Sequence, residues 1–156
     1  MKILAVDYGD SRTGLATCDH TEFLTTPITP QITLKARPKV AAEVCRIAQE
    51  QKAELIVVGL PLNMDGTEGS RCVKSRRFAA RLATACGVPV VLWDERRTTV
   101  TAAGILSANS TFGADRKARL DSVSAAVILE SFLAWRKAHP GEEPPEVAAP
   151  TAPEQA

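Results

Sequence analysis

Met1-Lys-Ile-Leu-Ala-Val-Asp7-Tyr-Gly-Asp-Ser-Arg-Thr-Gly14-Leu-Ala16 is the stretch that decides the fold of this 156-residue chain. Its apolar run, residues 3–6, predicts a buried strand that ends at Asp7. Residues 9–14 have the glycines and small polar side chains of a turn, so a returning strand should begin at Leu15. A carboxylate at the end of a buried strand is costly unless cations or hydrogen bonds compensate it. Asp7 therefore either accepts backbone N–H bonds from its own turn or belongs to a functional site.

The rest of the chain predicts one more strand and then alternating helices and strands. The continuous apolar runs at 55–59 and 88–93 are typical of parallel strands covered on both faces. Apolar residues at helical spacing predict the helices. The expected elements are a third strand at 23–28 and helices at 38–50, about 70–86, 98–106 and about 120–137. We therefore expect an α/β fold: a mixed five-stranded sheet, three antiparallel strands and then two parallel ones, with helices on both faces.

Length and composition fit one domain of a soluble protein, residues 1–138, followed by a tail, residues 139–156. The tail is rich in Pro, Glu and Ala, and we expect it to be disordered. It holds four of the 18 acidic residues and none of the 19 basic ones, so the remainder of the chain is net positive. That balance permits an acidic partner such as a nucleic acid.

Nothing in the sequence predicts a membrane span or a secretion signal, so a cytoplasmic location is expected. The four cysteines are scattered and form no C-x-x-C pair or Cys/His cluster. We therefore expect reduced thiols and no structural zinc.

Acidic residues stand at three separated points: Asp7, the pair Asp94 and Glu95 after the strand at 88–93, and Asp121 near the start of the last helix. The carboxyl ends of parallel strands meet at one edge of a sheet, where α/β proteins bind their ligands. Only one of the neighbours Asp94 and Glu95 can face inward, because adjacent residues alternate between faces. Each acid also has an ordinary interpretation, since Asp121 can stabilise a helix start and Glu95 can lie in a solvated turn.

Together these acids predict a site for Mg²⁺ or Mn²⁺, which bind carboxylate oxygens, water and phosphate. Two ions about 3.5–4 Å apart, held by Asp7, Glu95 and Asp121, would suit hydrolysis of a phosphodiester. The loop 63–68 follows the strand at 55–59, so it should lie beside this edge and position substrate, with Asp65 a possible further acid. The residues that we expect to contact nucleic acid are Arg12, Asn63, Arg96, Lys117 and Arg119.

Four blocks of the chain resemble the YqgF (RuvX) family, the pre-16S ribosomal RNA nucleases, which are also described as Holliday-junction-resolvase-like. The blocks are Asp7-Tyr-Gly-Asp-Ser-Arg-Thr-Gly-Leu-Ala16, Val58-Gly-Leu-Pro-Leu-Asn-Met-Asp-Gly-Thr-Glu68, Asp94-Glu-Arg-Arg-Thr-Thr99 and Asp121-Ser-Val-Ser-Ala-Ala126. The resemblance covers residues 1 to about 138 and implies a ribonuclease H-like fold. It also implies maturation of the 5′ end of pre-16S rRNA, with the ribosomal small subunit as a partner. Asp7, Glu95 and Asp121 match the family's acidic positions, whereas Arg97 and Thr98 stand where Leu-Ser is more usual.

Three other functions compete with an RNA nuclease. The first is a nuclease for branched DNA, which would act as a symmetric dimer. The second is a non-catalytic RNA- or ribosome-binding module, in which the acids are structural. The third is a kinase or ATPase of the actin/sugar-kinase type, whose phosphate loop also has an Asp-x-Gly. That class uses two such domains around a cleft, and this chain has no evident second copy.

Overall fold

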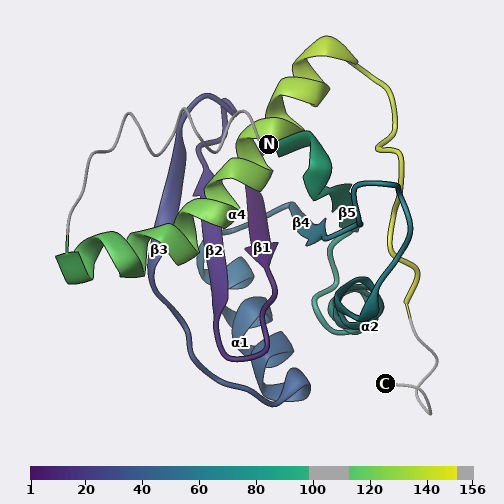
Figure 1. Cartoon of the computed structure of the whole chain (residues 1–156). Helices are drawn as coiled ribbons and strands as arrows, with labels where there is room; N and C mark the ends of the chain where they lie inside the picture. The colour runs from purple at the N-terminus through teal and green to yellow at the C-terminus, as the bar shows by residue number, and fades with distance from the viewer. Residues whose placement is uncertain (99–112, 151–156) are drawn as a thin grey trace.

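The protein, described here by a computed structural model, folds around the mixed sheet that the sequence predicts (Figure 1). The structure describes the backbone of residues 1–98 and 113–150, and the side chains of residues 1–96 and 123–150. The sheet order is β3-β2-β1-β4-β5. Antiparallel pairs join β1 to β2 and β2 to β3, whereas β4 is parallel to both β1 and β5. The strands are β1 (Ile3–Asp7), β2 (Thr13–Cys18), β3 (Thr25–Ile32), β4 (Leu55–Leu60) and β5 (Val90–Asp94).

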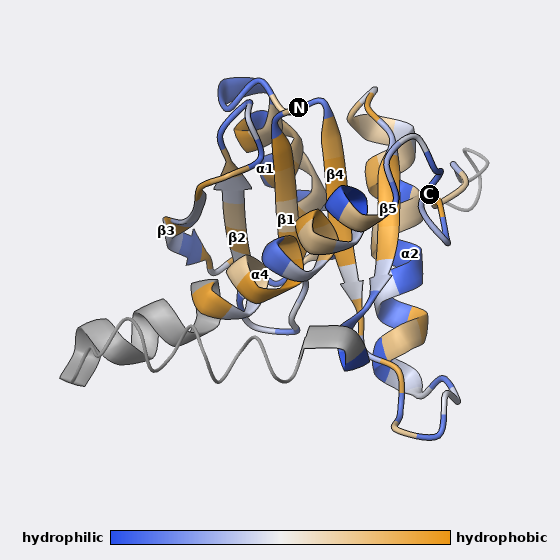
Figure 2. Ribbon diagram, turned by 90° about the horizontal axis from the view of Figure 1, so that it is seen from above, coloured by the Kyte–Doolittle hydropathy of each residue, from blue (hydrophilic) through white to orange (hydrophobic). Residues whose placement is uncertain are grey.

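Helices cover both faces of the sheet, as expected. On one face, α1 (Arg37–Glu50) and α2 (Ser70–Ala85) pack over Leu4, Val6 and their neighbours. On the other, α4 (Gly113–Ala138) crosses β1, β2 and β3 and packs over Ile3 and Ala5. Figure 2 shows apolar residues along β1, β4 and β5 between these layers. Alternation along β1 therefore assigns odd-numbered residues to the α4 face and even-numbered ones to the α1/α2 face.

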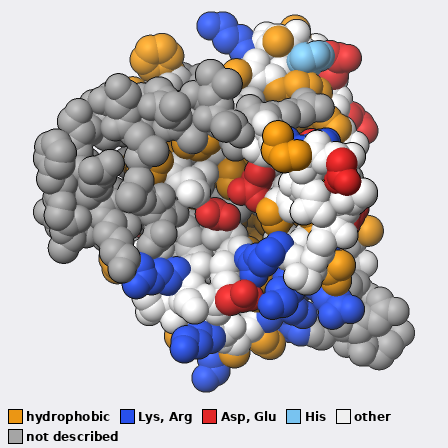
Figure 3. Space-filling model, viewed as in Figure 1, with side chains coloured by type: hydrophobic (Ala, Val, Ile, Leu, Met, Phe, Trp, Pro, Cys, Tyr) orange, Lys and Arg blue, Asp and Glu red, His pale blue; other side chains and the backbone are white. Residues whose placement is uncertain are grey.

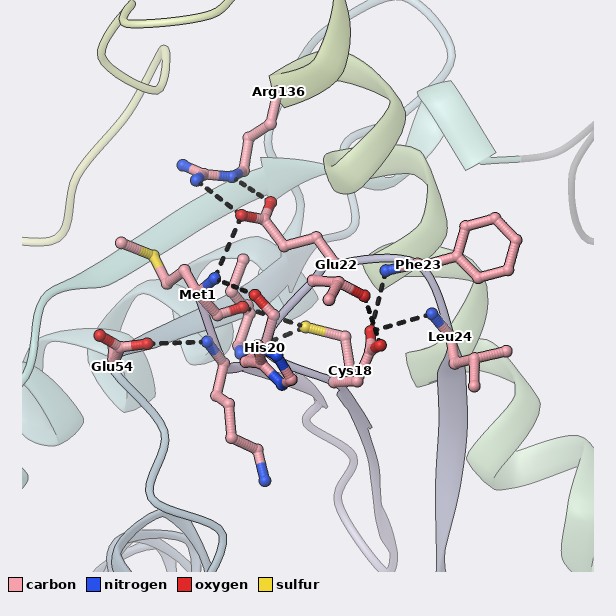
Figure 4. Close-up of polar contacts among 12 residues, drawn as sticks. Met1, Cys18, His20, Glu22, Phe23, Leu24, Glu54 and Arg136 are labelled. Atoms are coloured by element: carbon pink, nitrogen blue, oxygen red, sulfur yellow. Dashed lines mark hydrogen bonds and ion pairs between the residues drawn. The ribbon is translucent and has the colours of Figure 1, made fainter.

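The end of α4 is fixed to the sheet by a pair of charges at the amino end of β1 (Figure 4). Arg136 donates to both carboxylate oxygens of Glu22, at 2.7 and 3.1 Å. The amino group of Met1 lies 3.4 Å from the same carboxylate. Arg136 lowers the pKa of Glu22, so this carboxylate is ionised at neutral pH. The pair thus joins the end of α4 to the loop between β2 and β3.

The last helix begins earlier than expected. The sequence predicts a start near residue 120 and a loop before it, but α4 starts at Gly113. The segment before residue 120 is rich in Ala, Arg and Lys, which favour helix without giving an apolar stripe. Most of the short helix expected at 98–106, and most of the loop after it, lie outside the described residues. The described part of that region is the 3₁₀ helix η1 (Glu95–Thr98).

The prediction of four reduced thiols is wrong for one pair. Cys45 on α1 and Cys86, just after α2, form a disulfide with their α-carbons 5.1 Å apart. Cys18 and Cys72 are free and buried. The spacing of the cysteines does not indicate this bond, because the partners meet only when α1 packs beside α2.

The prediction of a disordered tail is also wrong up to residue 150. Val147 forms an antiparallel bridge with Val91 of β5. The N–H of Leu92 donates to the carbonyl of Glu146 at 3.0 Å, and that of Ala148 donates to the carbonyl of Val90 at 2.8 Å. An edge strand offers such unpaired backbone groups to any extended segment, which composition alone does not reveal. Residues 151–156 lie outside the described part of the chain.

Candidate active site

Asp7 and Glu95 come together on the α4 face of the sheet. Asp7 ends β1 and shares the parity of Ile3 and Ala5, which pack in the core under α4. Glu95 follows β5 directly and begins η1. Burial, and then repulsion from the carboxylate of Asp7, raise the pKa of Glu95 from 4.5 to about 7. The two acids are therefore close enough for each to disfavour the charge of the other.

Gly59 makes this approach possible, because β4 lies between the strands that carry the two acids. A β-carbon at Gly59 would stand 3.0 Å from Cδ of Glu95 and 2.5 Å from Cδ1 of Ile128 on α4. The Glu95 side chain thus lies across the strand at a position where only hydrogen fits. The glycine of the block Val58-Gly-Leu-Pro therefore leaves the space that the side chain of Glu95 occupies.

Asp94 faces the opposite side of the sheet. It has the parity of Leu92, which packs in the core under α1 and α2. Its carboxylate accepts the backbone N–H of Arg96 at 2.9 Å and guanidinium N–H groups at 2.7 to 3.1 Å. Asp94 and Arg96 therefore form a local pair, and Glu95 is the acid of this segment that faces Asp7.

The loop 63–68 lies beside that pair, since Arg96 donates to the carbonyl of Met64 at 3.4 Å. Inside the loop, Asp65 accepts the backbone N–H of Thr67 at 3.0 Å and its hydroxyl at 2.6 Å. These bonds lower the pKa of Asp65, the hydroxyl bond most of all. Asn63 donates its amide to the same hydroxyl at 2.9 Å. Asp65 and Asn63 thus shape the turn of this loop.

Arg71 is a residue of this region that the sequence interpretation missed. It lies in the first turn of α2 and donates to the carbonyl of Tyr8, the residue after Asp7. Its positive charge acts to lower the pKa of Glu95, opposing the effect of Asp7. The helix α2 carries several arginines, and only the fold shows which one approaches the acids.

Of the other residues expected in the site, the structure describes the side chain of Arg12 but not those of three residues on α4. Arg12 is exposed at the turn between β1 and β2. That turn requires glycine at position 9, where a β-carbon would stand 2.3 Å from the carbonyl oxygen of Arg12. Three residues lie within α4, on the same face of the sheet as Asp7, but their side chains are outside the described residues: Lys117, Arg119 and Asp121. Asp121 stands beyond the first turn of α4, so it does not cap the start of that helix.

The described acids can hold a hard divalent cation. Asp7 and Glu95 offer only oxygen donors, which Mg²⁺ and Mn²⁺ prefer, and their mutual repulsion is what a cation between them would relieve. Among side chains that the structure describes, no group of three potential metal ligands gathers. Asp121, outside that set, is the candidate for the third.

No helix in the described part of the chain has the length and apolar character needed to cross a membrane.

The chain is similar to known proteins along most of its length. A family model described as "RuvX: Holliday junction resolvase" matches residues 1–135. A protein of Syntrophus aciditrophicus named "Putative pre-16S rRNA nuclease" is 40% identical over 133 residues, which cover 85% of this chain and 88% of that protein. One of the same name from Chloroflexus aurantiacus is 37% identical over 140 residues, covering 88% and 90%.

Among solved structures, Thermus thermophilus RuvC in complex with a Holliday junction substrate superposes with a TM-score of 0.59. The alignment covers 89% of this chain and 97% of that one at 14% identity, which speaks for the fold alone. The expected ribonuclease H-like fold is thereby confirmed. A family model that spans most of the chain and relatives of this similarity lead to one conclusion: the protein belongs to the RuvX family.

Proposed function

We propose that the protein is a metal-dependent endonuclease that hydrolyses phosphodiester bonds of pre-16S rRNA at its 5′ end. The observation that supports this most is the pairing of two carboxylates, Asp7 and Glu95, across Gly59 at the carboxyl ends of parallel strands. A half-buried pair of like charges is unfavourable by itself, and a purely structural site has no need of it. Such pairs are typical of functional sites.

In this proposal Asp7, Glu95 and Asp121 would hold Mg²⁺ or Mn²⁺. The ions, when bound, supply a water of lowered pKa and stabilise the charge on the leaving oxygen. Asp7 is fixed by β1 and Glu95 by the start of η1, so the oxygens of both are oriented before substrate arrives. Arg71 offsets part of the negative charge around Glu95. Hydrolysis would join the oxygen of a water to phosphorus and break the bond to the leaving oxygen, which would take up the proton that the water loses.

The substrate assignment rests on the relatives, which carry the name of a pre-16S rRNA nuclease. A chain that is net positive outside its acidic tail suits a polyanionic substrate. We place the reaction in the cytoplasm, on the precursor of the small ribosomal subunit, with Arg12, Asn63, Arg96, Lys117 and Arg119 among the candidate contacts to RNA.

Cleavage of a four-way DNA junction is the second candidate, because the family model bears the description of a Holliday junction resolvase. A direct test presents the purified protein with end-labelled pre-16S rRNA and with a labelled four-way junction, each with Mg²⁺, Mn²⁺ or chelator. We expect cleavage of the RNA, dependent on the metal. Preferred cleavage of the junction would replace the proposed substrate, and binding without cleavage of either would indicate a non-catalytic module.

Asp7→Asn tests the site itself. The amide is nearly isosteric but lacks the charge and one ligating oxygen. Cleavage should fall at least a hundredfold, about 2.7 kcal/mol of barrier, while RNA affinity and melting temperature stay near those of the parent chain. Glu43→Gln, a matched loss of charge on α1, should leave all three unchanged. Full cleavage by Asp7→Asn would rule out the site as proposed.

A further inference from the structure

Two cations on α2 share one acidic partner at the tip of the β1–β2 hairpin. Nη1 of Arg71 lies 2.8 Å from Oδ1 of Asp10. Nζ of Lys74 lies 3.2 Å from the same oxygen. The cations are three residues apart, so they project from one side of the helix. A single carboxylate oxygen between an Arg and a Lys has the arrangement of a phosphate oxygen in a nucleic-acid contact.

This cluster lies next to the candidate active site. Arg71 also binds the carbonyl of Tyr8, which directly follows Asp7, and its charge is felt by Glu95. Figure 3 shows acidic side chains in a hollow of this face, with Lys and Arg side chains gathered below them. A polyanion whose scissile group reached Asp7 and Glu95 would therefore pass over Arg71 and Lys74.

Asp10 is the replaceable member of the cluster. Its side chain is 61% exposed, whereas those of Arg71 and Lys74 are 37% and 44% exposed. Exposed ion pairs are weak, since water competes for both partners. Lys74 and Arg71 lower the pKa of Asp10, so the carboxylate stays ionised and keeps its place in the free protein. A phosphodiester, also an anion, can take that place at little cost.

We propose that Arg71 and Lys74 form a contact for the phosphate backbone of the substrate, and that Asp10 occupies this contact in the free protein and is displaced when nucleic acid binds. The identity of the ligand as the nuclease substrate rests on the proposed function. The contact itself requires only a nucleic-acid backbone. Removal of the Asp10 charge should thus strengthen binding, which is the opposite of what a stabilising surface ion pair would do.

The test measures the affinity of the full chain for a labelled single-stranded RNA in chelator, so that no cleavage occurs. Asp10→Asn should lower Kd roughly two- to fivefold, the scale of a surface ion pair. Glu43→Gln, which removes the carboxylate paired with Arg46, makes the same change in net charge elsewhere and should leave Kd nearly unchanged.

Arg71→Gln and Lys74→Gln should each weaken binding, Arg71→Lys should weaken it less than Arg71→Gln, and Arg77→Gln on the same helix should not. Asp10→Asn should have no effect when added to the double variant Arg71→Gln/Lys74→Gln. Single-stranded DNA of the same sequence should show the same Asp10→Asn effect, because phosphates are common to both. Melting temperatures verify that each variant is folded.

Three results would overturn the proposal: unchanged or weaker RNA binding by folded Asp10→Asn, an equal gain in Glu43→Gln, or a gain seen with RNA alone. None of these depends on turnover. A protein that never cleaves RNA would refute the proposed function and leave this binding test intact.

Discussion

The carboxyl carbon of Glu95 stands 3.0 Å from the point where a β-carbon of Gly59 would lie. Glu95 follows β5 and begins η1, and its side chain extends over β4 toward the end of β1. One side chain thus connects the ends of three neighbouring strands. Ile128 of α4 fills the rest of the same space. Position 59 therefore controls both the packing of α4 and the placement of one acid.

Gly59→Ala should lower stability and activity for two different reasons, which a second substitution can separate. The new methyl would clash with Cδ1 of Ile128 and with Glu95, and overpacking of this kind costs about 1–3 kcal/mol. Adding Ile128→Val removes Cδ1, so urea unfolding should show recovered stability in the double variant. Cleavage should stay low there, because Glu95 is still displaced. Recovery of activity together with stability would mean that the position of Glu95 is unimportant.

Glu95 should make the metal-free protein less stable as pH rises. Its pKa is raised from 4.5 to about 7 on folding, so the folded state holds this proton more tightly than the unfolded state does. Its favourable contribution is complete below pH 4.5 and lost as pH rises through about 7, a change on the order of 3 kcal/mol. In chelator, Glu95→Gln should therefore gain stability relative to the parent between pH 4.5 and 8.

Urea unfolding of both proteins at several pH values measures that difference. Mg²⁺ at pH 8 should stabilise the parent more than Glu95→Gln, because bound metal favours the ionised acid. A stability difference that is the same at every pH would contradict the burial and charge repulsion assigned to Glu95.

Reduction of the Cys45–Cys86 bond should destabilise the fold without touching the site. The bond closes a loop between residues 41 apart in sequence, for which about 2–4 kcal/mol is typical. Reductant should lower the free energy of unfolding of the parent chain by this amount. The variant Cys45→Ser/Cys86→Ser should have the same free energy of unfolding as the reduced parent. Reductant should not change it further, although Cys18 and Cys72 remain. A parent chain indifferent to reductant would show that the bond contributes nothing.

Proline substitutions should separate two neighbouring positions of the C-terminal segment. Ala148→Pro removes the N–H that donates to Val90, about 1 kcal/mol for one hydrogen bond, and should release the segment. Val147→Pro should be tolerated, because the bridge geometry turns the Val147 N–H away from β5. Hydrogen exchange at the amide of Leu92 and cleavage by protease near residue 141 report the release. Equal effects of the two prolines would contradict the observed register.

Local patterns in the sequence predicted the strands and indicated two acids that the structure brings together. The apolar runs around Val6, Val58 and Leu92 suffice to find β1, β4 and β5, and strand ends point to Asp7 and Glu95. The choice of Glu95 over Asp94 needed the structure, since parity along β5 decides it. Contacts between distant segments could not be predicted from the sequence. They are the contacts of Arg71 with Tyr8, Cys45 with Cys86, and Val147 with Val91. No local period or spacing encodes them.

The pairing of Val147 with Val91 also bears on how copies of this chain can associate. It shields the middle of one border of the sheet, and at the other border β3 contains Pro27 and Pro30, which lack N–H donors. Neither edge of the sheet therefore readily pairs with a strand of a neighbouring molecule, which protects the protein against aggregation through sheet extension. Two copies acting together on a branched substrate would therefore have to meet through helices and loops.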